Sequence, residues 1–153
     1  MLDKIDREIV DLLYKDARLS FRELGERVFL SANTVAERVR RLQQNQVLLG
    51  FHAEVNLQAL GLPLQALIEV KMAHGTSAQD FEAAIQSIPG ILEASLMTGS
   101  YDYMLRVACI DQLDLMRLIE ALRQRAGVQD THSRVILQNK LVLGGVARMT
   151  SSA

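Results

Sequence analysis

Three things are scarce in this sequence: cysteine, long apolar runs and an excess of charge of one sign. The single cysteine, Cys109, allows neither a disulfide framework nor a CxxC metal pair, and it is expected in the core. Charge or glycine interrupts every apolar stretch before it reaches the roughly 18 residues of a membrane span, and the start MLDKIDRE is too acidic for a signal peptide. A formal net charge of −1 argues against a protein that coats nucleic acid by bulk attraction. We expect a folded cytoplasmic protein.

Recognisable catalytic motifs are also missing. The chain has no glycine-rich phosphate loop followed by Lys and Ser/Thr, and no nucleophile elbow. His52, His74 and His132 lack the spacing of a metal site and are expected to be structural or surface residues. Asp102 could act as a general base, but no nucleophile can be assigned beside it. We therefore expect no enzyme activity, no metal and no cofactor.

Three short helices are predicted in the first fifty residues. Asp3, Ser20 and Ser31 can each cap the start of one helix, and Glu23 completes a capping box with Ser20. Only two residues separate the second helix from the cap of the third. Two helices joined by so tight a turn, with a first helix to pack on, are typical of a helix-turn-helix. The alternative is a plain three-helix bundle with a solvated polar face.

The third predicted helix has a polar face that suits the major groove of DNA. An amide can pair with adenine, a carboxylate can accept from cytosine, and a methyl can contact thymine. The three arginines of this helix are predicted to contact phosphates and set the register. The predicted DNA-contacting residues are Ser31, Ala32, Asn33, Thr34, Ala36, Glu37, Arg38, Arg40 and Arg41.

The remainder of the chain alternates between strand and helix patterns. Residues 51–63 are predicted to be a linker, with a short extended piece over residues 51–55. The predicted strands cover residues 64–74, 91–97, 103–108 and 128–137. Ser77 and Asp111 can cap the two helices between them, and residues 98–102 can turn a hairpin.

This order predicts an α+β protein. An N-terminal helix-turn-helix domain over residues 1–50 is followed by a ferredoxin-like βαββαβ domain over residues 64–153. The strands are rich in Leu, Ile, Val and Met, so we expect a second copy to cover the open face of the sheet in a homodimer. The methionines are expected to be packing groups.

Taken together, these segments resemble the Lrp/AsnC family of regulators over nearly the whole chain. The matching segments are LDKID at 2–6, ARLS at 17–20, LS at 30–31, RVRRL at 38–42, TGSYDY at 98–103, and GV at 127–128 with Thr131. Phe29 and Gln46 depart from the family pattern, because each stands where the family usually has glycine. Glycine at such positions often supplies a positive φ.

The resemblance implies a nucleoid-associated regulator of transcription that binds double-stranded DNA. It also implies dimers that assemble further to octamers, and a small-molecule effector, an amino acid, bound between dimers near the hairpin. The carried-over effector positions are Gly99, Tyr101, Asp102 and Thr131, with Asp102 as a partner for an ammonium group. The alternative for these hairpin residues is a tight turn that needs Gly and Asp for its conformation alone.

Two other functions remain open at this point. Siroheme decarboxylases are similar to this family in fold, and such an enzyme would need histidine and arginine around a tetrapyrrole pocket. Here the histidines are scattered, and the arginine cluster lies on the third predicted helix. An architectural DNA-binding protein without an effector would bind random and selected DNA within a small factor.

Overall fold

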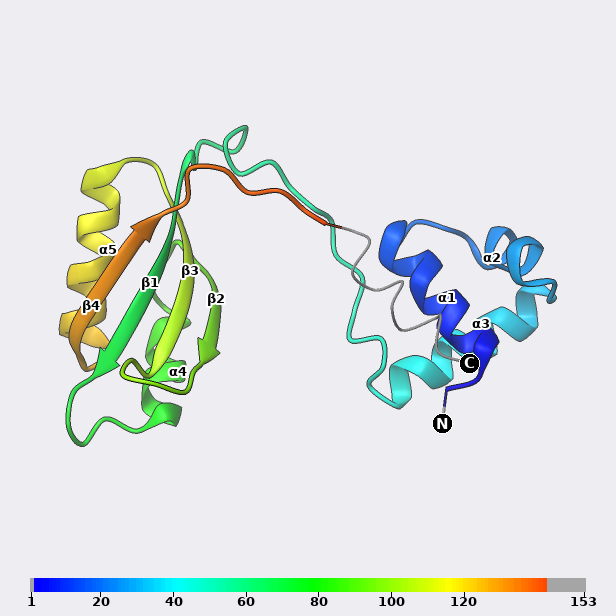
Figure 1. The fold of residues 1–153 in the computed structure, drawn as a ribbon, viewed down its shortest axis with the longest axis horizontal. Helices are drawn as coiled ribbons and strands as arrows, with labels where there is room; N and C mark the ends of the chain where they lie inside the picture. The colour runs from blue at the N-terminus through cyan, green and yellow to red at the C-terminus, as the bar shows by residue number, and fades with distance from the viewer. Residues whose placement is uncertain (1, 143–153) are drawn as a thin grey trace. The chain divides into compact units, whose positions relative to one another are not determined.

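A computed structural model describes residues 2–142 of the chain (Figure 1). The end of the second predicted domain, residues 143–153, lies outside the described residues. The helices are α1 (Lys4–Lys15), α2 (Phe21–Val28), α3 (Ala32–Gln44), α4 (Ala78–Ile85) and α5 (Gln112–Arg125). The strands are β1 (Leu64–Met72), β2 (Ile91–Leu96), β3 (Tyr103–Cys109) and β4 (Val128–Val135).

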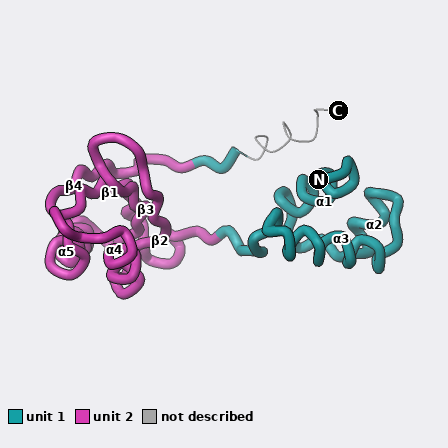
Figure 2. The backbone as a smooth tube through the Cα atoms, turned by 90° about the horizontal axis from the view of Figure 1, so that it is seen from below, with its two compact units in different colours: residues 1–54, 140–153 teal, residues 55–139 magenta. Residues whose placement is uncertain are grey.

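The chain divides into two compact units with separate hydrophobic cores (Figure 2). The helix unit contains α1, α2 and α3 and ends at Glu54, and the chain from Lys140 is grouped with it. The sheet unit covers Val55–Asn139. The boundary between the units therefore falls inside the predicted linker, residues 51–63.

Hydrogen-bonded caps fix the start of each helix in the helix unit. The side chain of Asp3 accepts from the backbone N–H of Asp6, and Ser20 and Ser31 cap α2 and α3 in the same way. Each cap satisfies a backbone donor that the helix leaves without an internal partner. All three predicted caps are confirmed. The helices enclose a core of Ile9, Leu13, Leu24, Val28, Val35, Val39 and Leu42.

Both positions where the resemblance predicts glycine adopt the left-handed backbone region. Phe29 has a φ of 57° and Gln46 a φ of 55°. At the first of these, the N–H of Leu30 donates to the carbonyl of Gly25 at 3.0 Å, which closes the end of α2. The chain thus keeps a glycine-type turn at each position without the glycine, at a cost in backbone strain.

The sheet unit is a four-stranded antiparallel sheet in the order β2-β3-β1-β4. Figure 2 shows α4 and α5 on the same side of the strands. Their apolar faces pack on alternate strand residues, including Ile68, Leu105 and the predicted core residue Cys109. This element order and strand order confirm the ferredoxin-like α+β prediction.

The expectation about the open face of the sheet needs correction. The apolar strand residues mostly face the helices, while the opposite face carries charged residues, Glu69, Lys71 and Arg106 among them. The open face therefore lacks the uniformly apolar surface on which the dimer was predicted. Residues 51–56 belong to no helix and to no paired strand, so the short extended piece predicted within the linker stays a prediction.

Candidate nucleic-acid interface and effector pocket

The first turn of α3 presents polar side chains to solvent. Asn33 and Thr34 are exposed there, and Val35 points into the core. The hydroxyl of Ser31 accepts from the N–H of Thr34 at 3.2 Å and lies 2.7 Å from its hydroxyl. This cap holds the N-terminal turn in a defined geometry, and leaves the amide of Asn33 as the most versatile donor and acceptor on it.

An open groove runs along the same face of α3. It is lined by Asn33, Thr34, Glu37, Arg38 and Arg41. All five are among the residues predicted to contact DNA, so the structure brings the central part of that prediction onto one surface. Ala32 and Arg40 are also exposed on α3, and Ala36 is half-buried.

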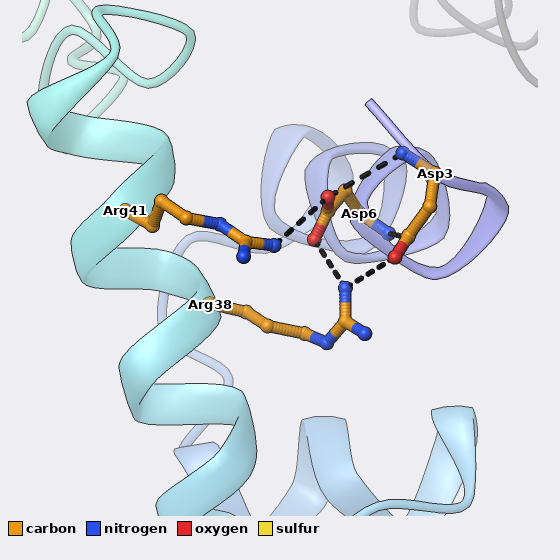
Figure 3. Close-up of polar contacts among 4 residues, drawn as sticks. All are labelled: Asp3, Asp6, Arg38 and Arg41. Carbon is orange, nitrogen blue, oxygen red and sulfur yellow. Dashed lines mark hydrogen bonds and ion pairs between the residues drawn. The ribbon is translucent and has the colours of Figure 1, made fainter. Parts of the chain in front are cut away.

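Arg38 does not point freely into solvent. Its Nη1 donates to Oδ2 of Asp3 and to Oδ1 of Asp6, both at 2.7 Å (Figure 3). The Asp6 side chain is only 3% exposed, and the Arg38 side chain is 21% exposed. The guanidinium lowers the pKa of Asp3, after the larger effect of the backbone N–H of Asp6. This pairing joins α3 to α1 and gives Arg38 a structural role, while its predicted phosphate contact stays a prediction.

Arg41 and Arg40 are the arginines that α3 presents to solvent. Arg41 reaches Asp6 only at 3.4 Å and its side chain is 55% exposed (Figure 3). Arg40 pairs with Glu37 at 2.6 Å, and both side chains are exposed. Surface pairs of this kind contribute little to stability and are easily exchanged for another anion. Both guanidinium groups can therefore turn to a phosphate.

A second site lies beside the β2–β3 hairpin in the sheet unit. A cavity of about 160 Å³ is lined by Glu69, Met97, Thr98, Gly99, Ser100, Tyr101, Tyr103 and Met104. Lys71 donates from Nζ to the carbonyl of Ser100 at 2.9 Å, which ties the turn to β1. The volume is below the about 300 Å³ at which drug-sized sites begin, so the cavity suits a molecule of amino-acid size.

Two of the four predicted effector residues line this cavity. Gly99 and Tyr101 do so, whereas Asp102 and Thr131 are not among its lining residues. The Oδ2 atom of Asp102 accepts from the backbone N–H of Met72 at 2.7 Å, and its own N–H donates to the carbonyl of Val70. Asp102 thus holds the hairpin against β1. This contact agrees with the alternative interpretation of the hairpin residues, in which Asp102 serves the conformation of the turn.

The comparisons with known proteins place both sites in matched domains. A model of the AsnC-type helix-turn-helix domain matches residues 2–43, and a model of the Lrp/AsnC ligand binding domain matches residues 65–142. The chain belongs to the Lrp/AsnC family of transcriptional regulators. The α3 groove of this Lrp/AsnC regulator lies within the first match, and the hairpin cavity lies within the second.

Relatives and solved structures agree with this membership. The leucine-responsive regulatory proteins of Salmonella typhimurium and Escherichia coli K12 are each 35% identical over 150 residues, covering 93% of this chain and 92% of the relative. A feast or famine regulatory protein from M. tuberculosis complexed with L-methionine superposes with a TM-score of 0.87 at 31% identity, covering 93% of this chain and 96% of that chain. A Neisseria meningitidis transcriptional regulator in complex with L-Met superposes with a TM-score of 0.82 at 31% identity, covering 90% of this chain and 91% of that chain.

The effector residues predicted from sequence include two of the eight residues that line the cavity in this Lrp/AsnC regulator, and three of the six that they miss supply its apolar wall and its carboxylate. Met97 and Met104 were expected to be core packing groups, yet they form an apolar wall of the cavity. Glu69 supplies a carboxylate, with its Oε2 2.8 Å from Nδ1 of His132. The signal that could have located Glu69 is the strand register, which pairs it with His132 on β4 and with Met104 on β3.

Other kinds of site find no support in the part of the chain that the structure describes. Within residues 2–142, no three His, Cys, Asp or Glu side chains come together as metal ligands. The helices over the same residues are all too short or too polar to span a bilayer.

Proposed function

We propose that this Lrp/AsnC regulator binds DNA sequence-specifically through α3 and changes its affinity or assembly when an amino acid occupies the hairpin cavity. The single observation that carries the DNA part is the groove along α3, which joins Asn33 and Thr34 to the exposed Arg41. Amide and hydroxyl groups at the N-terminal end of a recognition helix can read base edges, while an arginine nearer its other end can hold the backbone.

The proposed complex contains at least a homodimer. Two α3 helices would enter successive major grooves of an imperfect palindrome, with half-sites about one helical turn or a multiple of it apart. Assembly of dimers to an octamer would allow DNA to wrap or loop. Because effector binding and DNA binding are thermodynamically linked, DNA must change the effector affinity by the same factor as effector changes the DNA affinity.

The chemistry of the cavity favours an α-amino acid with an apolar or thioether side chain. Glu69 is the proposed partner of the ammonium group, since its Oε2 is taken by His132 and its Oε1 remains for a ligand. The backbone N–H groups of the turn at residues 98–101 are the proposed donors to the carboxylate. Met97 and Met104 would contact the side chain, and polarizable methionines adapt well to such ligands. The L-methionine in the two similar structures supports this class of effector.

The test is a selection of bound duplexes from random DNA, followed by titration of the winner with and without a pool of the twenty amino acids. We expect a palindromic winner whose affinity or stoichiometry shifts with the pool, and fractionation of the pool then identifies the amino acid. Enrichment without any shift would retain sequence-specific binding and remove the amino-acid response, whereas random and selected duplexes bound within a small factor of each other would support an architectural role. If no duplex is enriched at moderate salt, the DNA proposal is wrong, and a tetrapyrrole absorbance assay becomes the next test.

A pair of matched variants tests the effector site separately. Glu69→Gln removes the proposed ammonium partner but keeps its size and its hydrogen bond to His132, so we expect the effector response to be lost while DNA affinity without effector is kept. Glu93→Gln makes the same chemical change on β2, outside the lining of the cavity, and should retain the response. If both variants respond equally to the effector, Glu69 is not the partner of its ammonium group.

A further inference from the structure

We propose that the phenyl ring of Phe29 contacts the apolar surface of duplex DNA beside the N-terminus of α3. This inference rests on the proposed placement of α3 in the major groove. It adds an apolar contact, from the turn of the helix-turn-helix, to the polar groups that the recognition helix supplies.

Phe29 is unusual in both backbone and exposure. Its φ of 57° lies in a region that disfavours side chains with a Cβ, and the residue is 93% exposed. Burial of the ring inside the folded chain therefore cannot offset the backbone strain, as it would for a packed aromatic residue. A strained, solvent-exposed aromatic residue next to a binding surface points to a contact made only in a complex.

The position of Phe29 indicates which partner the ring meets. It stands two residues before Ser31, the cap of α3, and two residues of chain span at most about 7 Å. Ser31, Ala32 and Asn33 are all exposed at this end of the helix. A duplex whose bases reach Asn33 would therefore lie within side-chain reach of Phe29.

The chemistry of a phenyl ring limits what it can recognise there. It has no strong hydrogen-bond donor or acceptor and no charge, so the available partners on DNA are thymine methyl groups and deoxyribose carbons. Such a contact releases no counterions. Its loss should lower affinity without changing the dependence of affinity on salt, in contrast to loss of a phosphate contact.

Gln46 offers a matched control within the same unit. Among residues 2–142, Phe29 and Gln46 are the two residues other than glycine that have a positive φ, and Gln46 is exposed as well. It follows the C-terminal end of α3, at the far end of the helix from Phe29. Gln46→Gly and Phe29→Gly relieve the same kind of backbone strain, but only the second removes the proposed contact.

The experiment compares Phe29→Gly, Phe29→Leu and Gln46→Gly in the full-length protein on the selected duplex. Both glycine variants should melt at or above the parent temperature. Phe29→Gly should bind about five- to tenfold more weakly with the salt slope unchanged, and Phe29→Leu should recover part of the loss. Gln46→Gly should bind like the parent.

A second experiment distinguishes the thymine methyl groups from the deoxyribose carbons. Each thymine of the selected duplex is replaced in turn by uracil, which lacks the methyl group. If one replacement abolishes the difference in affinity between the parent and Phe29→Gly, the ring contacts that methyl group; if the difference survives every replacement, the ring contacts deoxyribose.

Three outcomes would overturn the inference. In the first, Phe29→Gly binds DNA as tightly as the parent and keeps its oligomer mass. In the second, Phe29→Gly binds more weakly but with a reduced salt slope. In the third, its affinity is unchanged while sedimentation shows a changed oligomer mass, which would assign the ring to a contact between copies of the chain. If the parent itself selects no duplex, the proposed function fails first, and that result is separate from these three.

Discussion

The two proposed binding surfaces of this regulator are built in opposite ways. The α3 groove comes from one continuous helix, positioned by a local cap and a two-residue turn. The hairpin cavity instead combines Glu69 on β1 with the turn at residues 98–101 and Met104 on β3. The α3 groove therefore depends on the stability of one small helical unit, whereas the hairpin cavity depends on the strand register across the sheet.

The most disruptive test of this difference is Gly25→Ala. A Cβ at Gly25 would lie 2.4 Å from the carbonyl oxygen of Leu30, and backbone of the turn must shift to accept it. We expect the helix unit to lose about 3 kcal/mol of unfolding free energy, with DNA binding lost and the sheet unit unchanged. Hydrogen exchange read separately for the two units measures this. Equal destabilisation of both units would show that they do not fold independently.

A smaller effect separates the two arginines of α3. Arg38→Ala leaves the buried Asp6 carboxylate with two longer contacts, to Arg41 and to the backbone N–H of Asp3, both at 3.4 Å, so we expect the helix unit to lose about 2 kcal/mol. Arg41→Ala should leave stability nearly unchanged, lower DNA affinity about tenfold and reduce the salt slope by about one unit. Urea unfolding and DNA titration at several salt concentrations measure both variants. The structural role of Arg38 would be refuted by a variant as stable as the parent.

These contrasts also explain what could be predicted from sequence. The caps at Asp3, Ser20 and Ser31 were identifiable because capping is local, and the fold followed from the order of strand and helix patterns. The pairing of Arg38 with Asp6 spans 32 residues, and no local pattern reports it. The same holds for Glu69 and His132, which only strand register brings together.

Strand positions also mislead when only residue type is considered. Met97 and Met104 have the composition of core residues, and their place in the cavity depends on which face of the sheet the helices cover. Asp102 has the charge expected of an ammonium partner, but it is not among the residues that line the cavity, and its Oδ2 accepts from the backbone N–H of Met72. Residue type indicates what chemistry is available, while register decides where it is used.

A pH-dependent test concerns the sheet unit alone. The Tyr103 hydroxyl donates to Oε1 of Glu82 at 2.6 Å, and this bond, with burial, raises the pKa of Tyr103 from 10.0 to about 12. Because the folded-state pKa is the higher one, the stabilisation is complete below pH 10 and is lost as the pH rises towards 12. Tyr103→Phe keeps the ring beside Phe81, should cost about 1 kcal/mol at neutral pH, and should remove this alkaline loss.

Urea unfolding of parent and Tyr103→Phe from pH 8 to pH 12 measures the difference. The two stability curves should converge as the pH approaches 12, while the helix unit changes equally in both proteins. Curves that stay parallel across this window would mean that the hydroxyl does not titrate as the geometry predicts.

The smallest expected effect is a gain in stability. Gln46 follows the end of α3 in the left-handed region, where the N–H of Val47 donates to the carbonyl of Leu42 at 2.9 Å. Gln46→Gly should keep this closure and relieve the strain of a side chain at positive φ, at the cost of a more flexible unfolded chain. We expect a net gain of about 0.5–1 kcal/mol in the helix unit and none in the sheet unit, measured by thermal unfolding with hydrogen exchange. A loss of stability would mean that the glutamine side chain contributes more at this turn than the strain removes.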